Sequence, residues 1–320
     1  MELTLRNLKK APVVNLARQA YYRYRFHGLM FDAWRYFVNG ESRKLYRLDK
    51  ERMAPSPLER KVIRELEKTG ISMVHLSDLM PGQMLSQIQE WAEAKLRAPE
   101  VQERIKVVES GGQPVAKSGK FYIVKPIGDY PVVDIRDPVM DISLSDSILR
   151  IVCGYLGMFS RLAAIDLWYN VAIDGPDVFS QRWHRDPEDR SIVKTFLYLR
   201  DVDETNGPFC YVPRTHRPGP FRQKIGRYNY PNDGAIEKKF PPNLRQVCTG
   251  TAGTLIFCDT TGFHKGGHPT IGARFVFNSV YTTNASEPLS KGVRQFFLRG
   301  ACSNLQNLAA QYAVGLLGDR

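Results

Sequence analysis

The segment Trp183-His184-Arg185-Asp186-Pro187 carries an imidazole and a carboxylate two residues apart. Alternate side chains of an extended segment point to the same side, so we expect His184 and Asp186 to share one face. Such a pair can supply two ligands of a metal site built from histidine and carboxylate groups. A helix-cap role for Asp186, beside Pro187, is the simpler interpretation only if the other motifs are absent.

Two residues far downstream complement this segment. His264 can provide a third ligand, and two histidines with one carboxylate hold Fe(II) on one face while leaving the opposite positions open. Arg274, ten residues further on, offers a planar guanidinium fork that suits a dicarboxylate. His268 is the rival third ligand, but the interval to Arg274 favours His264. The pattern predicts an iron-dependent oxygenase with a dicarboxylate co-substrate.

Length and composition agree with a globular protein. The chain has 320 residues, 43% of them hydrophobic, which is enough for one large β-core with added helices. Its five cysteines have no CxxC spacing and are odd in number, so we interpret them as inert thiols in a reducing compartment. No apolar run is long enough to span a membrane, and no signal-peptide core is present. We therefore expect a cytoplasmic protein of unknown oligomeric state.

Positive charge is concentrated in residues 1–55. This part has 12 Lys and Arg against 5 Asp and Glu, a net +7 of the chain's total +12, and it is rich in aromatic residues. We interpret it as a basic, aromatic, helical N-terminal extension to a catalytic domain of residues 56–320. It either packs on that domain or contacts an anionic membrane or glycolipid from the cytoplasmic side. Nucleic acid is not the expected partner, because no recognised nucleic-acid motif accompanies the charge.

Several helices are expected at the start of the domain. Ser56, Pro57 and Glu59 form a capping box that begins a helix ending near Gly70. A strand follows over residues 71–76, a second helix runs from Pro81 to about residue 96, and residues 109–120 form a loop. An amphipathic pattern predicts one further helix over residues 141–157.

The remainder is mainly β. Five stretches rich in β-branched and aromatic residues are bounded by Gly, Pro, Asp and Asn: residues 162–171, 193–199, 209–212, 254–257 and 274–282. Short strands with long polar connections and no alternating helices favour a double-sheet jelly roll. The expected fold is therefore mainly β (α+β), a jelly-roll core with flanking helices.

The combined motifs resemble the phytanoyl-CoA dioxygenase-like family. The resemblance covers about residues 68–285 and rests on His184-Arg185-Asp186, Asn206-Gly207-Pro208, Val212-Pro213-Arg214-Thr215-His216, His264-Lys265-Gly266 and Arg274. It implies a double-stranded β-helix, or cupin-like, fold that binds Fe(II), 2-oxoglutarate and O2.

The same resemblance implies roles for particular residues. His184, Asp186 and His264 would be the metal ligands, Arg274 would pair with the distal carboxylate of 2-oxoglutarate, and Asn170 would assist it. Two positions depart from the family pattern. Gly266 replaces a small hydroxyl residue and removes one expected co-substrate hydrogen bond, and Arg214-Thr215 replaces Gly-Ser in a turn.

The reaction implied is hydroxylation of an unactivated C–H bond, with release of succinate and CO2. Halogenases of this fold lack the carboxylate that Asp186 provides, whereas desaturation and ring formation stay open. Basic residues near the metal motif, namely Arg182, Arg185, Arg190 and Lys194, suit an anionic or lipid- or glycolipid-linked small molecule. The alternatives are a catalytically silent jelly-roll binding protein and a zinc-dependent hydrolase that uses the same ligands.

Overall fold

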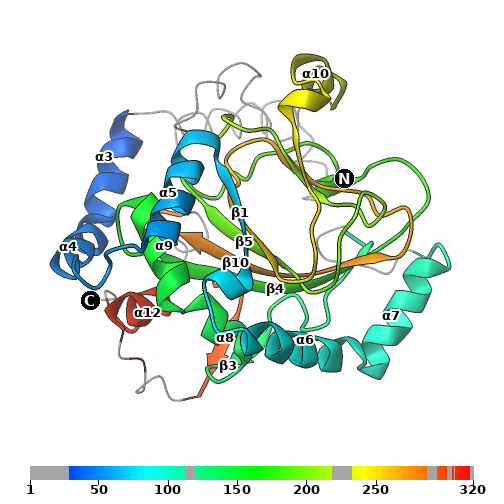
Figure 1. Ribbon diagram of the computed structural model, residues 1–320, viewed down its shortest axis with the longest axis horizontal. Coiled ribbons are helices and arrows are strands. Elements are labelled where there is room, and N and C mark those ends of the chain that lie inside the picture. The colour runs from blue at the N-terminus through cyan, green and yellow to red at the C-terminus, as the bar shows by residue number, and fades with distance from the viewer. Residues whose placement is uncertain are drawn as a thin grey trace, which may run out of the picture.

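The structure is a computed structural model that describes residues 29–112, 120–217, 233–286, 294–300, 305 and 307–317 (Figure 1). Among these residues the larger sheet has six strands, in the order β1-β8-β5-β10-β4-β2. Their bounds are β1 Ile71–His75, β2 Ile123–Val124, β4 Arg161–Val171, β5 Val193–Tyr198, β8 Thr254–Asp259 and β10 Ala273–Thr282. All neighbouring strands in it are antiparallel.

A second, smaller sheet faces the larger one. It has the order β7-β6-β9, with bounds β6 Phe209–Tyr211, β7 Gln246–Cys248 and β9 His264–Gly266. A parallel pair, β3 Val132–Asp134 and β11 Phe297–Arg299, lies apart from both. The two antiparallel sheets confirm the predicted jelly-roll core.

Alternating side chains divide the core into two layers. On β10, Phe275 and Phe277 pack in the cluster that faces the helices, whereas Val276 packs between the two sheets. On β5, Leu197 faces the helices and Phe196 faces the smaller sheet. The inner face of the larger sheet therefore lines the space between the sheets, where a ligand can bind.

Helices cover the outer face of the larger sheet, and in Figure 1 α5, α6, α8 and α9 lie together on one side of the labelled strands. The helix bounds are α3 Leu29–Val38, α4 Gly40–Leu48, α5 Pro57–Thr69, α6 Gln83–Leu96, α7 Pro99–Glu109, α8 Pro138–Ser143, α9 Asp146–Leu156, α10 Asp233–Lys239 and α12 Leu308–Ala313. Short 3-10 helices span Leu76–Asp78, Phe179–Gln181 and Pro242–Leu244.

Helix α5 follows the predicted capping pattern. Ser56 Oγ accepts from the Glu59 amide, the Glu59 carboxylate accepts from the Ser56 amide, and Gly70 ends the helix at φ 85°. The second helix and the strand after Gly70 are also confirmed.

The prediction of one continuous helix over residues 141–157 was wrong at its start, although Asp146–Leu156 is helical as predicted. The chain forms α8 and α9 instead, because Ser145 turns to an extended conformation and caps α9 by accepting from the Ile148 amide. Helix α7 was not predicted. Of the expected loop at 109–120, residues 113–119 lie outside the described part of the chain.

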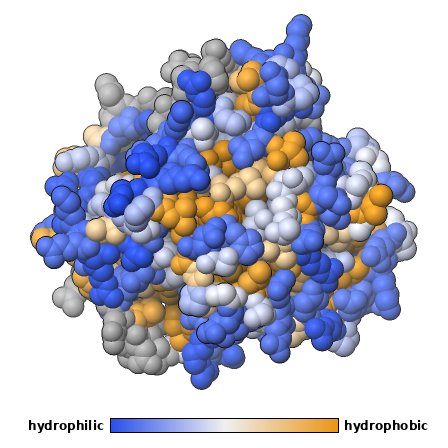
Figure 2. All heavy atoms as spheres, viewed as in Figure 1, coloured by the Kyte–Doolittle hydropathy of each residue, from blue (hydrophilic) through white to orange (hydrophobic). Residues whose placement is uncertain are grey.

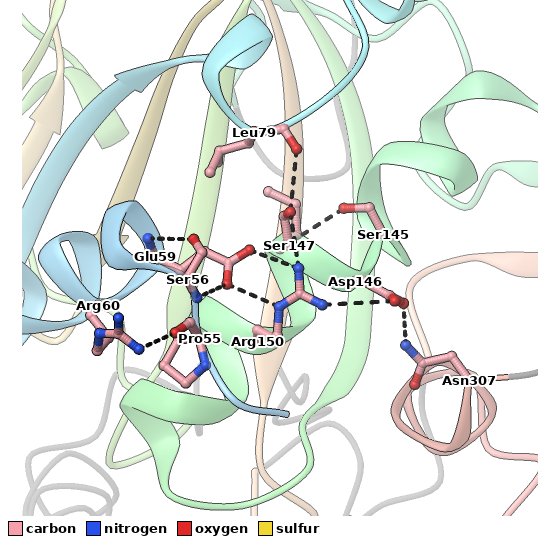
Figure 3. A network of polar contacts seen from close by, with 11 residues as sticks. Pro55, Ser56, Glu59, Arg60, Leu79, Ser145, Asp146, Ser147, Arg150 and Asn307 are labelled. Atoms are coloured by element: carbon pink, nitrogen blue, oxygen red, sulfur yellow. Dashed lines mark hydrogen bonds and ion pairs between the residues drawn. The ribbon is translucent and has the colours of Figure 1, made fainter. Parts of the chain in front are cut away.

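A buried ion pair joins α5 to α9 (Figure 3). Arg150 Nε and Nη2 donate to the two carboxylate oxygens of Glu59, each over 2.9 Å, and the Glu59 side chain is 2% exposed. Arg150 also pairs with Asp146, whose carboxylate accepts from Asn307. The helical layer is therefore held by charged as well as apolar contacts.

The described part of the N-terminal extension packs on the domain. Arg35 on α3 pairs with the buried Asp189 over 2.9 Å, close in sequence to the His-x-Asp segment, and Asp189 also accepts from Thr283. Tyr46 on α4 contacts the ring of Phe159 at 6.1 Å. Residues 1–28 lie outside the described residues, so the division of the chain at residue 55 stays a prediction.

On the face shown in Figure 2, apolar residues gather near the middle and hydrophilic residues surround them. Other exposed apolar side chains, Trp34, Phe37 and Leu48, belong to α3 and α4, which lie at the left edge of the view in Figure 1. In the described residues, no helix has both the length and the apolar character required to cross a membrane.

Candidate active site

Backbone pairing brings the two candidate histidines together. The His184 amide donates to the His264 carbonyl over 2.9 Å, and the His264 amide donates to the His184 carbonyl over 3.0 Å. The His-x-Asp segment therefore extends the smaller sheet beyond β9. The two imidazole rings lie with their centroids 4.2 Å apart.

Asp186 faces both rings. Its amide donates to the Thr260 carbonyl over 2.9 Å, which fixes the segment in the extended form that the spacing predicted. Asp186 Oδ1 lies 4.0 Å from His184 Nε2, and Oδ2 lies 3.6 Å from His264 Nε2. One potential ligand atom from each of the three residues lies within 4.8 Å of the others.

Hydrogen bonds orient the two imidazoles. His184 Nδ1 lies 2.8 Å from the Arg182 carbonyl, and His264 Nδ1 lies 3.0 Å from the Gly262 carbonyl. A carbonyl only accepts, so each Nδ1 carries the proton and each Nε2 presents a lone pair toward Asp186. Burial lowers the pKa of both imidazoles, which keeps them neutral. Two lone pairs converging with a carboxylate fit a divalent cation.

Lys194 on β5 provides positive charge beside this cluster. Its Nζ lies 2.7 Å from Asp186 Oδ2, and both side chains are largely buried. Burial alone would raise the pKa of Asp186, but Lys194 and the two histidines hold it well below its usual range. Burial, followed by the charge of Asp186, raises the pKa of the neighbouring Glu188 to about 7.

Arg274 and Asn170 form a second polar group, opposite each other on β10 and β4. In the amide orientation that satisfies both groups, Asn170 Oδ1 accepts from Arg274 Nη2 over 3.0 Å and from Nε over 3.1 Å. Arg274 Nη1 donates to the Gly207 carbonyl. These contacts use three of the five N–H donors of the guanidinium. One N–H on each terminal nitrogen then has no contact among the described residues. Two such donors match one carboxylate.

Gly266 lies directly behind this guanidinium. A Cβ at this position would lie 3.0 Å from Arg274 Nη2. The position where the sequence lacks a small hydroxyl residue is therefore next to the donors that would hold a carboxylate. The lost hydrogen bond stays a prediction.

Both groups line one pocket between the sheets. It encloses about 610 Å³ of space free of atoms, part of it open to solvent. Its lining includes His184, Asp186, His264, Arg274 and Asn170, together with Lys120, Tyr122, Trp168, Lys194, Phe196 and Tyr198. The three candidate metal ligands and the Arg274–Asn170 pair therefore share a cavity, an arrangement that would suit a metal with a dicarboxylate co-substrate.

Other histidines lie outside this cluster. His268 contacts Asp177 and the Ile173 carbonyl, and His216 contacts the Glu67 carbonyl. His75 contacts the Ala252 carbonyl. The structure thus brings His264, and not His268, to His184 and Asp186. His27 lies outside the described residues.

The basic residues near the motif separate into two kinds. Arg185 stacks on the Phe263 ring at 3.7 Å, and Arg190 pairs with Asp32, so both contribute to the fold. Arg182 is exposed, and of these four only Lys194 lines the pocket. Sequence reasoning did not single out Lys120, which is the last residue of the segment 109–120 that was expected to be a loop.

Comparison with known proteins places the chain in a family. The model of the phytanoyl-CoA dioxygenase family matches residues 67–270, more than half of the chain, and stops four residues before Arg274. No curated protein matches the chain.

Three similar solved structures are as follows. EctD from S. alaskensis, crystallised with 2-oxoglutarate and 5-hydroxyectoine, has 17% identity, covering 70% of this chain and 75% of that chain, with a TM-score of 0.49. The carbocyclase SnoK from nogalamycin biosynthesis has 15% identity, 78% and 97% coverage and a TM-score of 0.47. The epimerase SnoN, in complex with Fe3+, alpha ketoglutarate and nogalamycin RO, has 14% identity, 71% and 84% coverage and a TM-score of 0.47.

The family match agrees with the resemblance inferred from the motifs, which began at about residue 68, and with the jelly-roll architecture. The chain belongs to the phytanoyl-CoA dioxygenase family, whose members are Fe(II)- and 2-oxoglutarate-dependent oxygenases that use O2.

Proposed function

We propose that this protein hydroxylates an unactivated C–H bond of a small anionic substrate, including one linked to a lipid or glycolipid. His184, Asp186 and His264 would hold Fe(II), and Arg274 with Asn170 would bind 2-oxoglutarate. The observation that carries the proposal is the convergence of the three ligand atoms within 4.8 Å in the cavity that Arg274 also lines.

Bound Fe(II) supplies the redox chemistry by which substrate, 2-oxoglutarate and O2 yield hydroxylated product, succinate and CO2. The protein supplies binding, orientation and exclusion of water. The Arg182 and Gly262 carbonyls fix the two imidazoles in the tautomer that presents Nε2 to the metal. Arg274 is 7% exposed, so a carboxylate bound there meets a desolvated cation rather than a screened one.

Asp186 favours hydroxylation over halogenation, because its carboxylate would hold the metal at the position that a chloride would need. A zinc-dependent hydrolase could use the same three ligands, but it gives no role to the buried Arg274 guanidinium. A silent binding protein gives no role to neutral imidazoles directed at a carboxylate.

The test is anaerobic titration of Co(II) and 2-oxoglutarate, followed by succinate detection with Fe(II), O2 and a metabolite and lipid screen. His264→Ala should remove Co(II) binding and substrate-dependent succinate release while the protein stays folded. His268→Ala, whose ring contacts Asp177 instead, is the matched control and should bind Co(II) normally. The reverse order of the two variants would contradict the ligand assignment, and wild type that binds Co(II) but not 2-oxoglutarate would favour the hydrolase.

A second proposal concerns the N-terminal extension, which we expect to contact an anionic membrane peripherally. Trp34, Phe37 and Leu48 are exposed on α3 and α4, and Lys44 and Arg47 are exposed on α4. Exposed aromatic and basic residues on adjacent helices are typical of segments that lie at a membrane surface.

A further inference from the structure

The pocket has a cation at each end of its floor, which is the inner face of the larger sheet. Arg274 lies opposite Asn170 at one end. At the other end Lys194 lies opposite Val280, six residues further along β10. Six residues of strand span about 20 Å. Both cations line the cavity, and Lys194 reaches the metal-binding cluster through its 2.7 Å contact with Asp186.

The inference made here rests on the proposed function, in which 2-oxoglutarate occupies the end of the pocket at Arg274. The co-substrate then has no need of Lys194, which lies beyond the metal-binding cluster. A dication bound by Asp186 would also offset the negative charge that now attracts Lys194. A buried ammonium group is costly without a counter-charge. The metal-loaded pocket therefore favours an additional anion at the end where Lys194 lies.

Lys120 is a second basic residue that lines the same cavity. Burial and the nearby charge of Lys194 lower its pKa, so Lys120 contributes less positive charge here than Lys194. Glu188 and Asp166 are the neighbouring carboxyl groups that could neutralise Lys194 from within the protein. Neutralisation of Lys194 by an internal carboxyl group would leave the pocket without a preference for anions. Neutralisation by a bound anion would instead make the pocket prefer anions to neutral molecules.

Two polar side chains lie between the ends of the floor. Asn278 is fully buried, and neither atom of its amide has a hydrogen-bond partner among the described residues. It lies opposite Phe196, which lines the pocket. Trp168 also lines the pocket, and its buried Nε1 donor likewise has no partner among the described residues. Buried polar groups are normally hydrogen-bonded, so each exception requires a partner such as a water, an ion or a ligand.

We propose that Lys194 binds a carboxylate or phosphate group of the substrate and thereby determines which C–H bond faces the metal site. Trp168 Nε1, which lines the cavity, binds a polar atom of the substrate beside that group. Lys194 is then a specificity-determining residue, and the anionic group enters the cavity itself rather than remaining at its mouth.

The experiment uses full-length protein loaded with Co(II) and saturating 2-oxoglutarate under anaerobic conditions. Two matched pairs of probes, butyrate with butyramide and glycerol 3-phosphate with glycerol, are titrated by calorimetry at constant ionic strength. The visible spectrum of Co(II) reports whether a probe binds beside the metal. The carboxylate and phosphate pairs distinguish the two possible anionic groups.

We expect wild type to bind at least one anion about tenfold or more tightly than its neutral partner, because a charge-assisted contact is formed. Lys194→Met should remove this preference, and Lys194→Arg should retain most of it. Lys265→Met is the matched control: it removes one positive charge and a 2.9 Å ion pair with Asp177, but Lys265 does not line the pocket. The control should keep the preference and the spectral change.

Absence of anion binding, equal binding of anions and neutral probes, or a preference that survives in Lys194→Met would overturn the inference. A loss of preference that is equal in Lys265→Met would also overturn it, since net charge alone would then be responsible. Failure of wild type to bind Co(II) and 2-oxoglutarate would instead contradict the proposed function on which the inference rests. The two failures are therefore distinguishable in one titration series.

Discussion

Replacing Arg274 with Ala should weaken the binding of 2-oxoglutarate with little change in metal binding. The guanidinium is 7% exposed, and its contacts with Asn170 and Gly207 leave one donor on each terminal nitrogen for a carboxylate. A hydrogen bond to a charged group contributes about 1.5–3 kcal/mol. Loss of this contribution corresponds to a decrease in affinity of about tenfold to 150-fold.

Calorimetric titration of 2-oxoglutarate into Co(II)-loaded protein, without O2, measures this decrease directly. Arg274→Lys should fall between wild type and Arg274→Ala, because an ammonium group keeps the charge but cannot reproduce a planar two-donor contact. Arg200→Ala is the control, since Arg200 pairs with Glu93 and does not line the pocket. Its affinity for 2-oxoglutarate should equal that of wild type.

Arg274→Ala also leaves the Asn170 and Gly207 oxygens without these donors, so the fold of each variant is checked by thermal unfolding before titration. Unchanged 2-oxoglutarate affinity in a folded Arg274→Ala protein would place the co-substrate site elsewhere. Equal losses of 2-oxoglutarate affinity in Arg274→Ala and Arg200→Ala would show that both substitutions act only through the long-range electrostatic potential of the protein.

Two further predictions concern stability and membrane contact. Arg150→Met should lower the free energy of unfolding near neutral pH by about 3 kcal/mol, because it leaves the buried Glu59 carboxylate without its cation. Arg60 is exposed, so Arg60→Met should change this free energy little (Figure 3). Burial would raise the pKa of Glu59, but Arg150 holds it below its usual range, so this contribution is present above the unfolded pKa and should disappear in acid denaturation curves as the pH falls through the folded pKa. Wild type should co-sediment with anionic vesicles in a salt-sensitive manner. Vesicle binding should decrease after charge reversal of Arg6, Lys9, Lys10, Arg18, Arg23 and Arg25. Equal binding of wild type and this variant at low salt would contradict electrostatic contact between the extension and the membrane.

The parts of the fold that the sequence predicted are those with strong local signals. The capping box at Ser56 and the glycine at residue 70 limit α5 through hydrogen bonds and a left-handed turn that act within a few residues. The long strands were predicted because β-branched and aromatic residues fill them. Strands β2, β7 and β9 have two or three residues, too few for a period of two to be recognised.

The boundary between α8 and α9 shows why a continuous apolar pattern can mislead. Ile142, Leu144, Ile148 and Ile151 are all buried, so their spacing resembles one amphipathic helix. Ser145 competes with helix continuation because its hydroxyl accepts from a backbone amide three residues later. Burial preserved the apolar pattern across a break that only the cap could have revealed.

The candidate ligands could be proposed from sequence because His184 and Asp186 are adjacent in the extended chain and His264 lies at a recognisable distance from Arg274. Asn170 came only from the family resemblance. Its contact with Arg274 depends on the register of β4 against β10, strands separated by about a hundred residues, and no local pattern encodes that register.

Lys194 shows the remaining limit and also a usable signal. A lysine in a strand is normally expected to point to solvent. On β5, however, Val193 and Leu197 belong to the core on the helix side, so alternation directs Lys194 and Phe196 between the two sheets. Because both faces of this strand are covered, the charged residue has no solvent-facing position available. A lysine within a strand that is buried on both faces therefore indicates a polar site inside the barrel, here beside Asp186.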